Sequence, residues 1–415
     1  MGDRTVRAAR HHLNPLPELA GRAIVGIESD RHLGNVRRMD HSPRSPNVVS
    51  LATALLACPS VTPARGPVFD ILAEALHALG FAVDRFVTGE APDGPVENLL
   101  ATRAGNGRHL AFAGHLDVVP PGDGWTNDAF APIERGGLLY GRGAVDMKGA
   151  IAAFVAAIPE TPGAPLTLII TGDEEGPATY GTRALIDRMR AQGGVPDLCL
   201  VGEPTSARRL GDTIKIGRRG SVNLWIAVAG LQGHVAYPQL ADNPIPRLVA
   251  ILAEIEAIVL DQGNRWFQPS NIEITDITVG NPATNVIPAR AEARISIRFN
   301  DEHTGAGLIE RIEAVVARHD PNATVTARVS GEAFLTEPGP LSALVAAAIE
   351  RHTGIVAELS TTGGTSDARF LSALCPTVEF GLLNATMHKL DEAVAIEDLI
   401  ALTTIYAEII ASVAI

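Results

Sequence analysis

The sequence predicts an α/β protein with a mixed sheet, into which a second, smaller α+β domain is inserted. From residue 67 onward, apolar strand-like segments alternate with amphipathic helical segments. This alternation is typical of a parallel or mixed sheet that is covered by helices on both faces. After Gly220 the order changes to β-α-β-β-α-β, the ferredoxin-like split unit, and the first rhythm resumes from about residue 334.

The expected elements follow from hydrophobic periodicity and from turn residues. Helical periodicity begins at Val48. In the larger domain we then expect helices at 67–79, near 147 and at 181–192, and strands at 81–86, 98–103, 109–114, 166–171 and 197–201. The inserted domain should contain strands 221–229, 271–279, 291–299 and 323–329 and helices 244–260 and 305–319. The last part should contain helix 341–353, strand 377–381 and helix 395–413.

These patterns divide the chain into four parts. Residues 1–46 are Arg-rich and patternless, end in a Pro-containing segment, and are predicted to be a disordered leader. Met39 is an alternative start, so whether residues 1–38 belong to the native protein stays open. We expect the larger domain in two pieces, 47–218 and 334–415, and the insertion at 219–333. Because ligand sites favour clefts between domains, the insertion is interpreted as a lid or a dimerisation arm.

Composition narrows the class of protein. With 415 residues, of which 46% are hydrophobic, the chain can form two domains with their own cores. A net charge of −13 argues against nucleic acid or an anionic membrane as a general partner. No apolar run has the length of a membrane span. The three cysteines are far apart and lack CxxC spacing, which favours a cytoplasmic protein over a disulfide scaffold or a thiolate metal site.

The segment 110–120 is an apolar run that ends in His115 and Asp117. In open α/β sheets, ligands bind at the carboxyl ends of strands, so these two side chains lie where chemistry is expected. A histidine that binds a metal commonly has a carboxylate on its other ring nitrogen, and His-x-Asp could supply both parts. The alternative is an ordinary hydrogen-bonded structural histidine.

Further carboxylates follow other predicted strands. Asp146 lies in a turn ahead of a helix, where it could instead be an N-cap. Three acids, Asp173 to Glu175, follow strand 166–171, and Glu203 follows strand 197–201. Clustered like charges are costly unless a cation compensates them, although a solvated acidic turn is the alternative for the triplet.

Together with a late histidine, these acids form a ligand set that suits zinc. The set is His115, Asp146, Glu175, Glu203 and His388. Five ligands exceed the needs of one open zinc site but would suit two metals that share a bridging carboxylate and a water. Glu174 would then remain free to act as a base.

These residues, in this order and spacing, resemble the co-catalytic zinc peptidase and deacylase family (M20), and the resemblance covers the chain from residue 48 onward. It implies a zinc-peptidase-like catalytic domain with a ferredoxin-like lid and dimerisation domain. It further implies two Zn²⁺ per subunit, for which Co²⁺ can substitute. His115 and Glu203 would bind one zinc, Glu175 and His388 the other, and Asp146 would bridge them. A cis peptide after Asp146 is also implied.

Other segments are similar to the desuccinylase branch of that family, among them 202–206, 215–221, 233–238, 285–288, 297–300 and 362–367. Gly172 stands where that branch more often has Ser. The resemblance implies that the substrate's acidic ends contact Arg218, Ser221, Tyr237, Asn285, Arg298, Gly364, Thr365 and Asn384. Guanidinium groups bind carboxylates bidentately, so the arginines suit this role. From the residues alone, the arginines could equally be surface charges and the tyrosine could be a packing residue.

His234 would, from its loop position, be an ordinary histidine. The resemblance implies that it reaches the active site of a neighbouring subunit and stabilises the tetrahedral oxyanion, which requires a homodimer formed through the inserted domain. Asp117 is expected to orient His115.

The expected activity is metal-assisted amide hydrolysis of a small acylated amino acid, with Glu174 as general base. The resemblance favours N-succinyl-LL-2,6-diaminopimelate, cleaved to succinate and LL-2,6-diaminopimelate in lysine and cell-wall synthesis. Deacetylation of acetylornithine, or of a related N-acyl amino acid, is the second candidate. A non-catalytic metal-binding protein with the same fold is the third.

Overall fold

The computed structural model describes residues 46–414. The predicted leader therefore lies outside the described residues, apart from Pro46. Among the helices that are described, none combines the length and the apolar character that crossing a membrane requires.

The larger part of the molecule is built on a sheet of eight strands in the order β1-β2-β6-β3-β7-β18-β8-β17. The strands β6, β3, β7 and β18 run parallel to one another, whereas β1, β2 and β8 join through antiparallel pairs. The predicted mixed sheet is confirmed. Its strands are β1 (Ala82–Thr88), β2 (Val96–Arg103), β3 (Leu110–His115), β6 (Leu166–Thr171), β7 (Leu198–Val201), β8 (Thr213–Lys215), β17 (Glu358–Ser360) and β18 (Thr377–Glu379).

Helices cover both faces of this sheet. Successive side chains of a strand point to opposite sides, so an all-apolar strand needs a packing partner on each face. On β3, Leu110 and Phe112 belong to one buried cluster, and Ala111 and Ala113 to another. The first cluster includes α1 (Val48–Leu56), α2 (Pro67–Ala78), α3 (Lys148–Ala157), α7 (Pro340–Thr353) and α9 (Ile396–Val413). The second includes α4 (Thr182–Ala191) and α8 (Ala368–Leu371).

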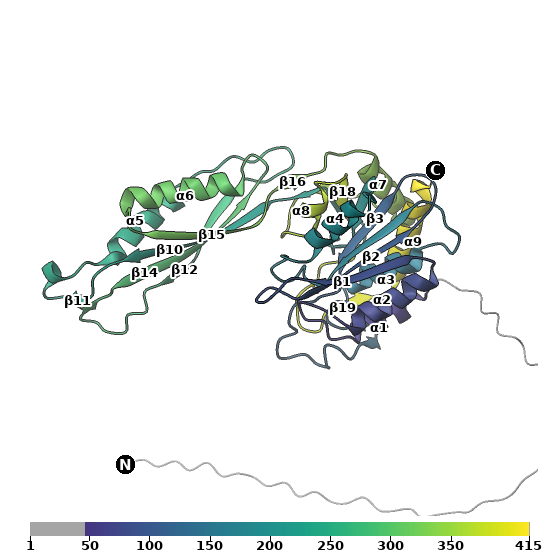
Figure 1. Cartoon of the computed structure of the whole chain (residues 1–415), viewed down its shortest axis with the longest axis horizontal. Coiled ribbons are helices and arrows are strands. Elements are labelled where there is room, and N and C mark those ends of the chain that lie inside the picture. Colours follow the sequence, from purple (N-terminus) through teal and green to yellow (C-terminus); the bar gives the residue numbers. More distant parts are fainter. Residues whose placement is uncertain (1–45, 415) are drawn as a thin grey trace, which may run out of the picture. The chain divides into compact units, whose positions relative to one another are not determined.

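The inserted segment forms a separate four-stranded antiparallel sheet in the order β12-β14-β10-β15, the ferredoxin-like arrangement that the sequence predicts. Two helices lie side by side along one face of it (Figure 1) and share a hydrophobic core with it. The elements are β10 (Gly220–Ala229), α5 (Pro244–Glu256), β12 (Asn271–Thr278), β14 (Arg290–Phe299), α6 (Gly305–His319) and β15 (Thr324–Gly331). Within residues 46–414, no helix packs on the opposite face of this sheet, which carries mostly polar side chains and the exposed Trp225.

One predicted helix end is wrong. We expected the helix from Pro244 to reach Leu260, but α5 ends at Glu256. Ile258 and Leu260 still pack against the core of the inserted sheet, from a segment that is no longer helical. Their hydrophobicity therefore reflects burial and not helical periodicity.

Several short strands were not predicted. β9 (Gly217–Arg218) pairs with β16 (Phe334–Leu335) where the chain enters and leaves the inserted sheet. β4 (Ile133–Arg135), β5 (Leu138–Tyr140) and β19 (Ala393–Ala395) form a three-stranded sheet. In the inserted segment, β11 (Gly233–His234) pairs with β13 (Val286–Ile287), and η1 (Pro238–Leu240) is a short 3-10 helix.

Candidate active site

Three adjacent parallel strands deliver the predicted ligands to one edge of the main sheet. His115 is the last residue of β3, the acidic turn of Glu174 and Glu175 follows β6, and Glu203 follows β7. Since β6, β3 and β7 are neighbours and run the same way, their carboxyl ends lie together. This arrangement is the one that the apolar runs with polar ends predicted.

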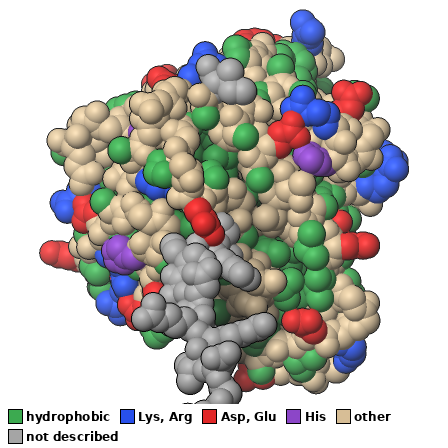
Figure 2. All heavy atoms as spheres, turned by 90° about the vertical axis from the view of Figure 1, so that its right-hand side faces the viewer, with side chains coloured by type: hydrophobic (Ala, Val, Ile, Leu, Met, Phe, Trp, Pro, Cys, Tyr) green, Lys and Arg blue, Asp and Glu red, His purple; other side chains and the backbone are tan. Residues whose placement is uncertain are grey.

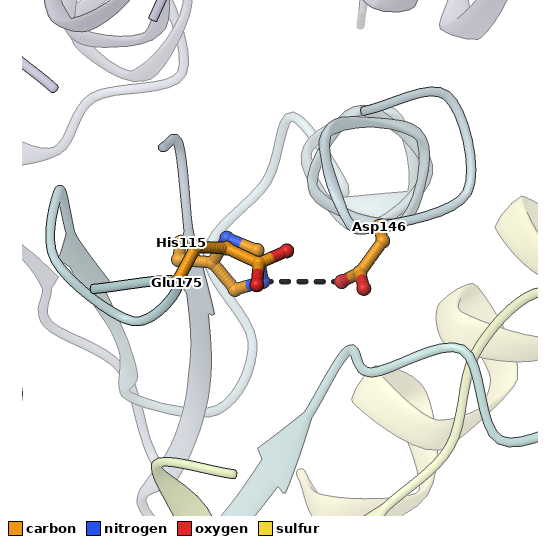
Figure 3. Close-up of side chains that lie close together, drawn as sticks. All are labelled: His115, Asp146 and Glu175. Carbon is orange, nitrogen blue, oxygen red and sulfur yellow. Dashed lines mark hydrogen bonds and ion pairs between the residues drawn. The ribbon is translucent and has the colours of Figure 1, made fainter. Parts of the chain in front are cut away.

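Asp146 lies between the two histidines. One of its carboxylate oxygens is 3.2 Å from Nε2 of His115 (Figure 3), and the other is 3.2 Å from Nε2 of His388. The same nitrogen of His388 is 2.7 Å from Oε1 of Glu175. The N-cap alternative for Asp146 is wrong, because the cap of α3 is Met147 and no side chain caps that helix. The peptide bond between Asp146 and Met147 is cis, as expected.

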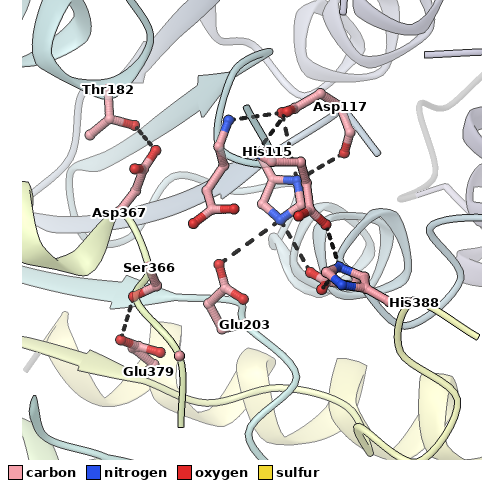
Figure 4. Close-up of polar contacts among 12 residues, drawn as sticks. His115, Asp117, Thr182, Glu203, Ser366, Asp367, Glu379 and His388 are labelled. Atoms are coloured by element: carbon pink, nitrogen blue, oxygen red, sulfur yellow. Dashed lines mark hydrogen bonds and ion pairs between the residues drawn. The ribbon is translucent and has the colours of Figure 1, made fainter. Parts of the chain in front are cut away.

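The other two acids complete the group. The donor atoms of His115, Glu174 and Glu203 lie within 4.8 Å of one another, as do those of His115, Asp146 and Glu175. Figure 4 shows Glu203 and His388 converging on His115 from different elements. The fold therefore brings together all five predicted ligands and the predicted base. These six residues form the acidic cluster.

Several carboxyl groups of the acidic cluster have pKa values shifted from their usual range. Burial and the charge of Glu203 raise the pKa of Glu174 well above its usual value. Burial and the charge of Asp146 raise the pKa of Glu203 to about 8. Burial alone would raise the pKa of Asp146, but hydrogen bonds with both histidines lower it. So many buried carboxylates repel one another, and a multivalent cation would relieve this repulsion.

Both histidines are held close to carboxylates. Hydrogen bonds with Asp146 and Glu175 raise the pKa of His388 to about 10. Burial lowers the pKa of His115, but the hydrogen bond with Asp146 and the charge of Asp117 outweigh it and raise the pKa well above normal. Positive charge is thus favoured at both imidazole positions.

Asp117 orients His115 differently from the way the sequence suggested. Nδ1 of His115 donates to the backbone oxygen of Asp117 at 2.9 Å, whereas the Asp117 carboxylate is 3.7 Å away. That carboxylate accepts hydrogen bonds from the backbone N–H groups of Glu174 (3.2 Å) and Glu175 (2.9 Å) instead. Asp117 therefore positions the acidic turn, and its backbone oxygen sets the tautomer of His115.

This geometry fits a pair of metal ions. Because Nδ1 of His115 donates to a carbonyl oxygen, the neutral imidazole would turn the lone pair of Nε2 toward the carboxylates, as a metal ligand requires. Imidazole nitrogen and carboxylate oxygen, without thiolate, form a donor set that suits zinc. Asp146 presents one oxygen to each histidine, as a bridging carboxylate would.

Asp173, the first acid of the triplet, does not join the acidic cluster. Its side chain is fully buried and accepts hydrogen bonds from the backbone N–H groups of Thr179 and Tyr180. The solvated-turn alternative is thus wrong for Asp173, which stabilises the loop after β6.

Glu392 is a site residue that the sequence did not reveal. It is fully buried, and its carboxylate accepts hydrogen bonds from the backbone N–H groups of Gly143, Val145 and Asp146 and from Arg142. Arg142 also donates to the backbone oxygen of Lys389, next to His388. Glu392 and Arg142 therefore connect the two loops that carry Asp146 and His388. No local pattern signals this, because the partners are about 250 residues apart in sequence.

A cavity of about 590 Å³, the inner cavity, opens beside the acidic cluster. Four predicted substrate-binding residues line it, namely Arg218, Gly364, Thr365 and Asn384. Arg218 is neither a surface charge nor free, because its Nε donates to both carboxylate oxygens of the buried Glu379 at 3.0 and 2.9 Å. Its Nη1 donates to the backbone oxygen of Gly364.

A second cavity of about 830 Å³, the outer cavity, adjoins the first, and Glu174, Glu175, Gly364 and Thr365 line both. Arg298 lines the outer cavity from the helix-free face of the inserted sheet. Ser221 is its direct neighbour across β10 and β14, although Ser221 itself is buried.

His234, Tyr237 and Asn285 line neither cavity. The rings of His234 and Tyr237 lie 5.8 Å apart, and the backbone of Asn285 bonds to Val235. Tyr237 is 57% exposed, so it is not a packing residue among the described residues. These three residues form one exposed group next to β11, apart from the acidic cluster of the same chain.

Comparison with known proteins decides the family. The profile of peptidase family M20/M25/M40 matches residues 111–412. The chain belongs to this family. An M20 relative from Sphingopyxis alaskensis, named succinyl-diaminopimelate desuccinylase, is 68% identical over 370 residues, which are 88% of this chain and 98% of the relative. A relative of the same name from Zymomonas mobilis is 56% identical over 371 residues, 89% of this chain and 98% of the relative.

Solved structures share the fold at low sequence identity. A tripeptidase from Staphylococcus aureus superposes with a TM-score of 0.74 at 20% identity, covering 88% of this chain and 98% of that one. The YXEP protein of Bacillus subtilis, described as a dinuclear metal-binding peptidase of the M20 family, has a TM-score of 0.65 at 15% identity, covering 88% of this chain and 97% of that one. The zinc-peptidase-like fold predicted from the sequence is confirmed.

Proposed function

We propose that this chain is a dinuclear zinc amidohydrolase that cleaves N-succinyl-LL-2,6-diaminopimelate to succinate and LL-2,6-diaminopimelate, in lysine and cell-wall synthesis. The observation that carries the proposal is the 68% identity over nearly the full length of a relative named succinyl-diaminopimelate desuccinylase. The acidic cluster supports it, because it places Glu174, the proposed base, among five candidate metal ligands.

In this proposal His115 and Glu203 would hold one zinc, Glu175 and His388 would hold the other, and both ions would share Asp146. Cobalt, which prefers similar ligands, can replace zinc. Bound metal would supply Lewis acidity that polarises the amide carbonyl and acidifies a water. Glu174 accepts the proton of the attacking water and passes it to the leaving amine. Burial raises the pKa of Glu174 above its usual value, which makes it a stronger base than an exposed carboxylate.

Substrate recognition would use both cavities. Gly364 and Thr365 line both of them, so a substrate held there lies beside Glu174. Arg298, with Ser221 beside it, lies on the inserted sheet and would contact a carboxylate of the substrate from that side. Arg218 is bound to Glu379, and we propose that it orders the wall of the inner cavity and adds positive charge there. Asn384 would bind from the loop before His388.

Homodimerisation through the inserted domain is part of this proposal. β10 has ten residues and so spans about 33 Å, and His234 follows its far end. In addition, α5 and the edge strand β12 expose Val249 (58%) and Ile277 (57%), which a second copy could cover. His234, Tyr237 and Asn285 would then complete the active site of the neighbouring subunit, where His234 stabilises the oxyanion.

The remaining predictions are part of the same proposal. The inserted domain would span residues 219–333 and the catalytic domain 47–218 and 334–415. A cytoplasmic location suits the three cysteines, Cys58, Cys199 and Cys375, all of which are free and buried.

The test is a side-by-side assay of the zinc-loaded protein on N-succinyl-LL-2,6-diaminopimelate and on acetylornithine. We expect kcat/KM to be at least about 100-fold higher on the first, since only the succinyl group, and not the acetyl group, carries a carboxylate. Comparable rates on both substrates would refute the substrate assignment. Zinc binding without turnover of any acylated amino acid would favour a non-catalytic protein.

A further inference from the structure

The outer cavity is rich in arginine. Five guanidinium groups line it, from Arg183, Arg294, Arg298, Arg328 and Arg369, whereas Glu174 and Glu175 are its acids. Arg294, Arg298 and Arg328 come from the helix-free face of the inserted sheet, and the other two come from α4 and α8. Of the five, only Arg298 has a role in the proposed substrate recognition.

These guanidinium groups have few anionic partners within the described chain. Arg183, Arg294, Arg298 and Arg328 form no ion pair there. Arg294 donates to the hydroxyl of Thr275, and Arg328 donates to the backbone oxygen of Pro177. Their positive charges are therefore not neutralised by neighbouring carboxylates.

Two of the arginines have buried nitrogens without a hydrogen-bond partner. The side chain of Arg369 is only 7% exposed, and its Nε is unpartnered. Its nearest acid, Asp367, is 3.6 Å away, and that carboxylate also accepts a hydrogen bond from Thr182. Nη1 of Arg298 is likewise buried and unpartnered. Unmet donors are costly in a folded protein, so such groups at a cavity wall point to an anionic ligand.

The arginines on the catalytic side are held in place by an aromatic ring. The guanidinium carbons of Arg183 and Arg369 lie 4.6 and 4.5 Å from the centre of the Phe370 ring. Cation–π contact of this kind orders a guanidinium without neutralising it. The positive charge is thus preorganised before any ligand arrives.

This concentration of positive charge is unusual for the protein, whose net charge is −13. On the face shown in Figure 2, basic side chains are scattered among acidic ones. A field of net charge −13 would repel an anionic substrate at long range, whereas a cleft lined by one sign of charge focuses its own field and raises the local concentration of counter-ions.

We propose that the outer cavity is an anion-capture site, in which Arg183, Arg294 and Arg328 draw polycarboxylate substrates toward the acidic cluster. This inference rests on the proposed desuccinylase function, because N-succinyl-LL-2,6-diaminopimelate carries three carboxylates and one ammonium group. The captured anion moves inward past Gly364 and Thr365, which line both cavities. These three arginines bring the substrate in, and Arg298 and the inner cavity position it.

The test is a matched pair of triple variants that each remove three positive charges. In the first, Arg183, Arg294 and Arg328 are all changed to Gln. In the control, Arg290, Arg311 and Arg318 are changed to Gln. These are exposed, line neither the outer nor the inner cavity, and change the net charge equally. Steady-state kinetics of the zinc-loaded enzymes on N-succinyl-LL-2,6-diaminopimelate are measured at low and high KCl, together with zinc content and Tm.

At low salt the first variant should show a KM raised roughly tenfold, with kcat within about twofold of the unaltered enzyme. The difference should shrink in about 0.5 M KCl, because salt screens charges over a few ångströms at that concentration. The control variant should match the unaltered enzyme. An unchanged KM, a loss of kcat instead, or an equal effect in the control would overturn the capture site. Absence of turnover by the unaltered enzyme would refute the proposed function itself.

Discussion

The carboxylate of Glu392 fixes the backbone that carries Asp146. Its Oε1 accepts hydrogen bonds from the N–H groups of Val145 and Asp146 at 2.9 and 3.3 Å. Its Oε2 accepts from Gly143 at 3.0 Å and from Arg142 at 2.8 Å. Asp146 faces both histidines of the acidic cluster, so their mutual geometry depends on a carboxylate that lines neither cavity.

Replacing Glu392 by Gln should weaken metal binding and the fold together. An amide has one acceptor oxygen in place of two and leaves the charge of Arg142 buried without its partner. We expect a loss of about 3 kcal/mol in the free energy of unfolding and a roughly 10- to 100-fold lower zinc affinity. Urea unfolding and chelator competition measure these quantities. Glu397→Gln, an exposed change on α9, is the control, and equal behaviour of the two variants would disprove the role of Glu392.

Variants at Asp117 and at His115 should affect different properties, catalysis in the first case and metal binding in the second. Asp117→Asn keeps the backbone oxygen that orients His115. It weakens the hydrogen bonds that the side chain accepts from the backbone N–H groups of Glu174 and Glu175. We expect kcat to fall about 10- to 100-fold while two zinc ions per subunit are retained. His115→Ala should lose one zinc. Metal analysis and steady-state kinetics distinguish the two, and zinc loss in Asp117→Asn would contradict the prediction.

Subunit complementation tests the placement of His234. His234→Ala and Glu174→Gln should each lower kcat by about 100-fold or more. If the proposed homodimer forms and exchanges subunits when the two variants are mixed, one site per mixed dimer has both an intact base and an intact histidine. About half of the dimers would be mixed, so about a quarter of the normal activity should return. If His234 acts in its own subunit, mixing restores nothing.

The stability of the inserted domain should depend on pH through Asp261. Burial alone would raise the pKa of this carboxyl, but hydrogen bonds from Ser270, Gly263 and His303 lower it from 3.8 to about 2. Because the folded pKa is lower than the unfolded one, the ionised group stabilises the fold above about pH 4. That contribution is lost as the pH falls through about 2.

Asp261→Asn should therefore cost about 2 kcal/mol at neutral pH, a size typical of hydrogen bonds to a charged group. The difference from the unaltered protein should narrow between about pH 4 and pH 2. Thermal unfolding across this range measures it, with the exposed Asp187→Asn as control. A difference that does not change with pH would show that shape, and not charge, matters at Asp261.

The sequence predicted those parts of the fold that depend on local patterns. β6 begins and ends where its apolar run does, at Leu166 and Thr171. The bounds of α6 were also predicted, and its N-cap Thr304 accepts a hydrogen bond from Gly307 as cap residues do. Apolar strands ending in polar residues pointed to the candidate metal ligands, because parallel neighbours place such ends side by side.

The short strands β4, β5 and β19 were not predicted, because a strand of only three residues is too short to show a hydrophobic periodicity. β4 and β5 are joined by Gly136 and Gly137, both with positive φ, and this Gly-Gly pair could have signalled a hairpin. Their third strand, β19, is about 250 residues away, and nothing local indicates that pairing. Glu392, Glu379 and the outer-cavity arginines other than Arg298 were missed for the same reason, since each depends on partners brought near only by folding.

The pairing of β9 with β16 has a consequence for how this architecture arises. Gly217 faces Leu335, and Arg218 faces Phe334, so the ends that flank the insertion are hydrogen-bonded neighbours only about 5 Å apart. A two-residue hairpin turn would close the gap. The larger sheet is therefore continuous without the insertion. Gain, loss or exchange of the inserted module in evolution would require one local genetic event and would leave the order of the catalytic strands untouched.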